Sequence, residues 1–161
     1  MRKLKWIIIL LNCLVLLFFF NRSVLSKESL IKSGRLILLE LAPVDPRSLM
    51  QGDYMSLRYA ITQGLDPDSI MKTGFVIVKL RPDGIADRVR IQPNNTPLIP
   101  GEYAIKYKSG TWNLNLGAES FFFQEGHGDR YAVAKYGGIK ADEKGGTVLI
   151  GLFDEHLKKI N

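Results

Sequence analysis

The sequence has little of what disulfide-bonded, zinc-binding or nucleotide-binding proteins require. Its one cysteine, Cys13, lies in a hydrophobic run near the N-terminus, so the rest of the chain has no thiol that could form a disulfide. The two histidines, His127 and His156, are too few for us to expect a metal site such as a zinc centre. No phosphate-binding glycine loop, dinucleotide fingerprint or metalloprotease motif occurs, and we therefore predict no cofactor.

Acidic residues are absent from the first 22 positions, and this absence explains much of the net charge. Basic residues at positions 2, 3, 5 and 22 give the segment +4 of the net charge of +6. Only +2 remains for everything that follows, which is too little for the basic stripe that binding to a phosphate backbone requires. We therefore expect no nucleic-acid partner.

The N-terminal segment has the composition of a membrane-spanning helix. Trp6–Phe20 is a run of fifteen residues with one strongly polar member, and a helix from residue 4 to residue 20 is roughly 25 Å long. The side chains of Lys5 and Arg22 can reach the interfaces of a hydrocarbon core of about 30 Å. We predict that residues 4–22 form an uncleaved signal anchor in contact with the lipid bilayer.

Two further properties of this segment follow from its flanks. Cleavage as a signal peptide is the alternative, because Val24 and Ser26 are small enough for a cleavage site, but Phe18–Arg22 is a poor approach to one. The basic residues before Trp6 predict that the N-terminus stays in the cytoplasm. The rest of the chain would then lie outside the cytoplasmic (inner) membrane, which it crosses once.

The remainder of the chain has the pattern of a mainly β domain. Short apolar runs alternate with proline and glycine, which indicates an antiparallel barrel-like or sandwich domain with short helical insertions. The chain divides into the anchor (1–22), a polar linker (23–34) and an extracytoplasmic β domain (35–161). The expected strands are Arg35–Leu41, Tyr54–Ile61, Gly74–Arg81, Ile85–Ile91, Tyr103–Tyr107, Trp112–Leu116, Phe121–Phe123, Ile139–Ala141 and Thr147–Leu152.

Turn-forming residues predict the local connections. Pro82-Asp83-Gly84 indicates a hairpin, since proline fixes φ and glycine accepts φ > 0, and Asp142–Gly146 indicates a second one. Asp45–Met50 begins with a helix N-cap residue and a proline, so we expect a single helical turn that ends at Gly52. Gly128–Lys135 is expected to form one or two helical turns.

Two stretches of the domain are similar to each other. Gly52-Asp53-Tyr54 followed by Leu57-Arg58-Tyr59 is echoed by Gly101-Glu102-Tyr103 followed by Ile105-Lys106-Tyr107, with one residue fewer between the parts. A proline-bearing loop precedes each. Either a duplicated loop-and-strand unit or chance explains the match.

The first of these stretches carries the candidate binding residues. Strand alternation predicts that Leu57 and Tyr59 enter the core, while Tyr54, Ser56 and Arg58 share the wetter face. A phenol, a hydroxyl and a guanidinium on one face can bind an anionic or peptide ligand. The binding candidates are Asp45, Arg47, Tyr54, Arg58 and Glu125, and the candidates for a structural role are Gly52, Asp53, Leu57, Tyr59 and Gly126.

Gly52–Tyr59 resembles the motif that names the GDYXXLXY family of bacterial membrane-anchored proteins. Leu41–Leu49 is similar to that family's lead-in, and Phe121–Gly126 is similar to a later element, with Gln124 where proline is common. The resemblance covers most of residues 35–153. The resemblance implies no established activity. Members of that family are often encoded beside a multi-spanning membrane protein, which the resemblance therefore implies as a partner.

A catalytic alternative rests on Ser56. Signal peptidases are also membrane-anchored β proteins, and they use a serine activated by a lysine. Lys79 or Lys106 is the candidate base, provided that its amine is buried and its pKa lowered. The leading hypothesis is a non-enzymatic accessory or ligand-binding domain; the alternatives are this serine hydrolase and a purely structural envelope anchor.

Overall fold

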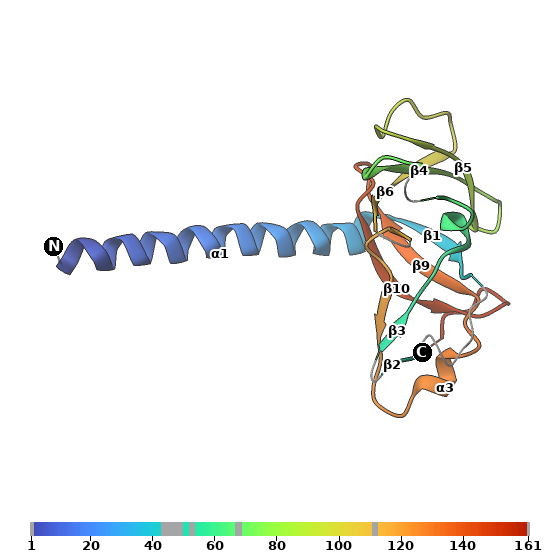
Figure 1. Ribbon diagram of the computed structural model, residues 1–161. Helices are drawn as coiled ribbons and strands as arrows, with labels where there is room; N and C mark the ends of the chain where they lie inside the picture. Colours follow the sequence, from blue (N-terminus) through green and yellow to red (C-terminus); the bar gives the residue numbers. More distant parts are fainter. Residues whose placement is uncertain (1, 43–49, 52–53, 67–68, 111–112, 161) are drawn as a thin grey trace.

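The computed structural model describes residues 2–42, 50–51, 54–66, 69–110 and 113–160. A single long helix, α1 (Arg2–Ser33), projects from a compact β domain, and Figure 1 shows it entering the domain beside β6, β9 and β10. The fold is mainly β with antiparallel sheets, as the sequence predicts.

Helix α1 is long and apolar enough to cross a membrane, from Lys5 to Ser33. Every side chain from Lys5 to Ser29 is exposed, including the whole apolar run Trp6–Phe20. Contiguous apolar surface of this size is rare on soluble monomers and marks a region that contacts another apolar surface or lipid. The helix continues through residues 23–33, for which the sequence predicts a polar linker.

The last turns of α1 are attached to the β domain. Leu30 is 5% exposed and belongs to the buried apolar residues. Lys27 Nζ donates a hydrogen bond to the Thr147 carbonyl (3.2 Å), and Lys140 Nζ donates to the Gly34 carbonyl (2.8 Å). Because the helix is continuous and its end is held by packing and hydrogen bonds, the domain has a defined position relative to the helix axis.

Three antiparallel sheets make up the domain, in the orders β1-β9-β10, β2-β3-β8 and β5-β4-β6-β7. Their side chains form one main core, in which Ile37, Met55, Ile105 and Leu152 represent the different sheets. The arrangement is sandwich-like, and the described strands close no barrel. The strands are β1 (Arg35–Glu40), β2 (Met50–Gln51), β3 (Tyr54–Ser56), β4 (Thr73–Leu80), β5 (Ala86–Gln92), β6 (Glu102–Ser109), β7 (Leu114–Asn115), β8 (Ser120–Phe122), β9 (Tyr136–Ala141) and β10 (Thr147–Phe153).

The two predicted hairpins are present. β4 and β5 pair across Pro82-Asp83-Gly84, where the Arg81 amide donates to the Ile85 carbonyl (2.8 Å) and Gly84 has φ +86°. β9 and β10 pair across the turn at Asp142, whose carboxylate accepts the amides of Lys144 (2.9 Å) and Gly146 (2.7 Å). Local turn chemistry therefore determines both connections.

The strand predicted for Tyr54–Ile61 is shorter than expected. β3 ends at Ser56, and the 3₁₀ helix η1 (Ala60–Thr62) follows. The chain turns because its next backbone partners come from elsewhere: the Leu57 amide donates to the Glu119 carbonyl (2.7 Å), and Tyr59 forms a bridge with Leu41. The alternation of buried and exposed side chains nevertheless continues through this segment.

The predicted helical insertions differ from the observed ones. Most of the turn predicted at Asp45–Met50 lies outside the described residues, but Met50 pairs with Met55 as part of β2, so a helix through Met50 is wrong. The later helix, α3, is a single turn (Gly128–Tyr131) and does not extend to Lys135.

Candidate functional site

The buried end of the motif contacts the loop of residues 116–119, which precedes β8. Tyr59, 1% exposed, donates its hydroxyl hydrogen to the Ala118 carbonyl. The Glu119 carboxylate accepts hydrogen bonds from the amides of Leu116 and Ala118, the second at 2.9 Å. Thr147 Oγ1 donates to the Leu116 carbonyl (2.6 Å). Residues 116–119 are thus held from outside by Tyr59 and Thr147, and within the loop by the Glu119 carboxylate.

Burial changes the acid-base behaviour of Tyr59. Removal of the phenol from water raises its pKa strongly above the ordinary value, and the nearby Glu119 carboxylate raises it further. The phenol therefore stays protonated and remains a hydrogen-bond donor throughout the physiological pH range. This behaviour suits a structural anchor and not an acid-base catalyst that works near neutral pH.

A cleft of about 230 Å³ lies beside the second half of the motif. Arg88, from β5, shapes one wall, because its guanidinium donates to the carbonyls of Ile61 (2.8 Å) and Gln63 (2.9 Å). The lining includes an exposed guanidinium, an amide and a carboxylate. The residues are Leu57, Arg58, Tyr59, Thr62, Gln63, Gly64, Leu65, Asn113, Leu114 and Glu119.

The three polar residues predicted to share one face alternate with buried neighbours, but only one of them lines the cleft. Arg58 is exposed and lines the cleft. Tyr54 lies opposite Phe122 in the β3–β8 pair, with ring centroids 5.8 Å apart, and Ser56 lies opposite Ser120. Neither Tyr54 nor Ser56 lines the cleft. The side chain of Phe122 is 74% exposed, so this part of the sheet presents an aromatic surface of its own.

The Ser-Lys pair does not assemble. Ser56 lies in the β2-β3-β8 sheet, whereas Lys79 and Lys106 lie on β4 and β6 of the four-stranded sheet. Both lysines are exposed, and Lys79 stands between Asp87 and Glu102 in the strand register. A lysine base requires a buried amine within hydrogen-bond reach of the serine, and neither lysine provides this.

The other predicted site residues occupy separate places. Glu125 is exposed in the loop after β8, where Gly126 has φ +81°. Nearby, the rings of Phe121 and Tyr131 pack edge to face at 4.9 Å. Asp45, Arg47, Gly52 and Asp53 lie outside the described residues, so their predicted roles stay predictions. No group of three metal-ligating side chains occurs in the described part of the chain.

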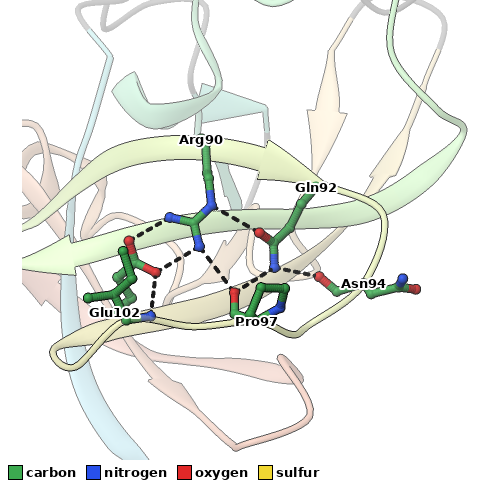
Figure 2. A network of polar contacts seen from close by, with 6 residues as sticks. Arg90, Gln92, Asn94, Pro97 and Glu102 are labelled. Atoms are coloured by element: carbon green, nitrogen blue, oxygen red, sulfur yellow. Dashed lines mark hydrogen bonds and ion pairs between the residues drawn. The ribbon is translucent and has the colours of Figure 1, made fainter.

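A polar network that the sequence analysis did not identify holds the proline-rich loop before β6. Figure 2 shows Arg90 in a bidentate ion pair with Glu102, at 2.5 and 2.8 Å, and in hydrogen bonds with Gln92 Oε1 (3.0 Å) and the Pro97 carbonyl (3.1 Å). The Arg90 guanidinium and then the Ile99 amide lower the pKa of Glu102. The alternation of charged residues along β5 was the available signal for this cluster.

The sequence signal for the cleft was weaker. The cleft is lined by residues from two loops far apart in the sequence, Thr62 and Gln63 in one and Asn113 and Glu119 in the other. The pairing of β3 with β8 and the hydrogen bonds of Leu57 and Tyr59 to residues 118–119 bring these loops together. Such a site depends on tertiary contacts, so a reading of local patterns does not detect it.

Comparison with known proteins agrees with the motif. No curated protein and no solved structure matches the chain. The family model described as "GDYXXLXY protein" matches residues 16–152, which include part of α1 and nearly all of the β domain. This match covers most of the 161 residues, and the chain therefore belongs to the GDYXXLXY family.

Proposed function

We propose that the chain is a single-pass, membrane-anchored accessory domain that binds a partner or ligand and performs no catalysis. One observation carries the proposal: a helix of membrane-spanning length, exposed along its apolar run, is continuous with the β domain and docked onto it through Leu30 and Lys27. Such a helix would hold the domain at a fixed position above the bilayer surface. The basic N-terminal flank favours an extracytoplasmic domain at the cytoplasmic membrane.

The cleft beside the motif is the proposed contact site. Arg58 provides an exposed guanidinium at its edge, and the Arg88 contacts with the η1 segment give the wall a fixed shape. A multi-spanning membrane protein is the proposed partner, because the exposed surface of α1 can pack against its helices while the cleft meets one of its extramembrane segments. The separation of Ser56 from Lys79 and Lys106 favours binding over hydrolysis.

Anchoring is tested by placing charge in the centre of α1. Leu11→Arg combined with Leu14→Arg should release the full chain from membranes during alkaline extraction, because each arginine at the centre of a helix costs about 3 kcal/mol of insertion free energy. Ile31→Arg is the control, because Ile31 lies on the same helix beyond the apolar run Trp6–Phe20. This variant should remain membrane-bound. Retention of the double variant would contradict the proposed span.

Orientation and partner binding need separate measurements. Protease added to spheroplasts should digest the β domain, and full protection there would reverse the proposed orientation. For the partner, Arg58→Ala should reduce the amount of a membrane protein that copurifies in mild detergent, as measured by mass spectrometry, without lowering the melting temperature. Arg130→Ala, an exposed change on α3, is the control and should reduce nothing.

A further inference from the structure

A second groove lies where α1 enters the β domain, and basic side chains surround it. Lys27 comes from α1, and Lys106 and Lys108 come from β6. The groove is shallow, has a volume of about 240 Å³ and also includes Asn115 and Gly117. We call it the root groove. Figure 1 shows that β6 and β10 border the base of α1, on the side of the domain from which the helix projects.

The three lysines of the root groove are available to a ligand. Lys106 and Lys108 are two residues apart on a strand, so both side chains point to the same face, and both are exposed. None of the described residues that line the groove is acidic, and no described acid forms an ion pair with these three lysines. By contrast, the nearby Lys32 is paired with Glu28 at 2.7 Å.

The position of the groove along the helix axis matches the lipid headgroups. With 32 residues, α1 is about 48 Å long, close to the ~40–45 Å thickness of a bilayer with its headgroups. Lys27 lies seven residues beyond Phe20, about 10 Å past the end of the apolar run. If α1 spans the bilayer, the root groove lies at the level of the phosphates.

We propose that the root groove binds the phosphate group of an anionic phospholipid. The inference rests on the proposed membrane anchoring, and it adds a lipid ligand to it. Three ammonium groups with no ion-pair partner among the described residues attract a single negative charge, and the side-chain amide of Asn115 can donate a hydrogen bond to a phosphate oxygen. Lys27 also holds the helix to the domain through the Thr147 carbonyl, so a bound headgroup would contact both parts of the chain.

The test measures protection of lysines in the full chain reconstituted in nanodiscs. Phosphatidylglycerol, compared with pure phosphatidylcholine, should slow acetylation of Lys106 and Lys108 about fivefold, the factor expected for one favourable contact of a basic residue with anionic lipid. Lys135 and Lys158, which lie away from the root groove, should react equally in both lipids. Soluble glycerol phosphate added to phosphatidylcholine nanodiscs should give no protection; equal protection would identify a free-phosphate site and overturn the lipid assignment.

A pair of variants separates a site from a general surface potential. Lys27→Gln should remove most of the protection of Lys106 and Lys108, whereas Lys32→Gln, with the same loss of charge on the same helix, should preserve it. Equal effects of both variants, or no effect of phosphatidylglycerol on protein recovered in nanodiscs, would overturn the proposal. If the wild-type chain does not remain with nanodiscs after alkaline washing, the proposed anchoring fails and the inference fails with it.

Discussion

Tyr59 and Tyr107 occupy corresponding positions at the ends of the two similar segments, and the two sites differ in one atom's environment. Both residues are 1% exposed. Each ring lies against a glycine of a neighbouring strand, Tyr59 against Gly137 of β9 and Tyr107 against Gly74 of β4. The Tyr59 hydroxyl donates to the Ala118 carbonyl, whereas the Tyr107 hydroxyl has no hydrogen-bond partner among the described residues.

This difference shows that burial and bonding have separate origins. Both tyrosines are buried because they follow the apolar side of an alternating segment, and both rings fill the space above a glycine. Only Tyr59 also ties a loop to the core, since its hydroxyl reaches residues 116–119. Tyr59 therefore links a loop to the core through its hydroxyl, whereas the described contacts of the Tyr107 side chain are those of its ring.

Substitution of the glycines should have the largest effect, and it should affect both sites alike. In Gly137→Val, the new Cβ would lie 2.8 Å from Tyr59 Cε1, and in Gly74→Val it would lie 2.9 Å from Tyr107 Cε1 and from the Gln92 carbonyl oxygen. We expect each variant to lose about 3 kcal/mol of unfolding free energy or more, measured by chemical denaturation of the full chain in detergent.

Alanine variants provide the graded control for that prediction. Gly137→Ala and Gly74→Ala should each cost less than the corresponding valine, because alanine adds only the first carbon. If one valine variant is tolerated and the other is not, the two tyrosine sites are not equivalent in packing.

The burial of Tyr59 can be predicted from the sequence, but the hydrogen bond of its hydroxyl cannot. The alternation of apolar residues predicts the burial of Tyr59 and Leu57, and the turn residues Pro82-Asp83-Gly84 predict the β4–β5 hairpin. The partner of the Tyr59 hydroxyl lies 59 positions away in the chain. Hydrogen bonds across such separations depend on how the sheets are stacked, which local periodicity does not contain.

The same limit applies to the predicted site and to the end of α1. Arg58 lines a cleft, whereas Tyr54 and Ser56 belong to β3 and are not part of its lining, and the binding role of all three stays a prediction. The continuation of α1 to Ser33 was also missed, since the polar residues after Arg22 resemble a linker until Leu30 packs on the domain. Local patterns predict which face of a segment is exposed to solvent. They do not predict which residues from distant parts of the chain pack beside that face.

Removal of the Tyr59 hydroxyl should have the second-largest effect. Tyr59→Phe preserves the ring above Gly137 but leaves the buried Ala118 carbonyl without its donor, so we expect a loss of roughly 1–3 kcal/mol in unfolding free energy. Denaturant titration of the full chain measures this loss. An unchanged midpoint would show that the hydroxyl does not fasten the loop at residues 116–119.

Alkaline pH gives an independent measure of the same hydroxyl. The folded pKa of Tyr59 is raised, so the unfolded chain loses its proton first, above a pKa of about 10, and stability is lost as the pH rises beyond that value. Burial also raises the pKa of Tyr107, which adds a dependence in the same direction. Tyr59→Phe should therefore weaken the alkaline loss of stability without abolishing it.

A smaller effect is expected at Glu102, the acidic residue of the second segment. Its carboxylate side chain is 5% exposed and is paired with Arg90, which is partly exposed, and Glu102→Gln removes the charge of this pair. Because the pKa of Glu102 is lowered in the folded state, its stabilising effect is present above the unfolded value of about 4.3 and is lost as the pH falls through the folded pKa.

The expected result is a lower melting temperature for Glu102→Gln at pH 7, with a difference from the wild type that shrinks under acid. Glu143→Gln, at an exposed position with no ion pair described, is the matched control and should leave the melting temperature unchanged. A difference that persists at pH 2 would assign the effect of Glu102 to shape and not to charge.

The smallest change is expected for Tyr107→Phe, and this variant decides whether the two tyrosines really differ. Its buried hydroxyl has been removed from water without a described protein partner, an arrangement that costs free energy in the folded state. Phenylalanine preserves the ring above Gly74 and removes that cost, so unfolding free energy should stay within about 0.5 kcal/mol of the wild type or rise slightly. Denaturant titration beside Tyr59→Phe gives the comparison directly, because the two variants lose the same atom from equally buried rings. If Tyr107→Phe is destabilised as much as Tyr59→Phe, the Tyr107 hydroxyl has a bonding partner, and the second segment fastens the fold in the same way as the first.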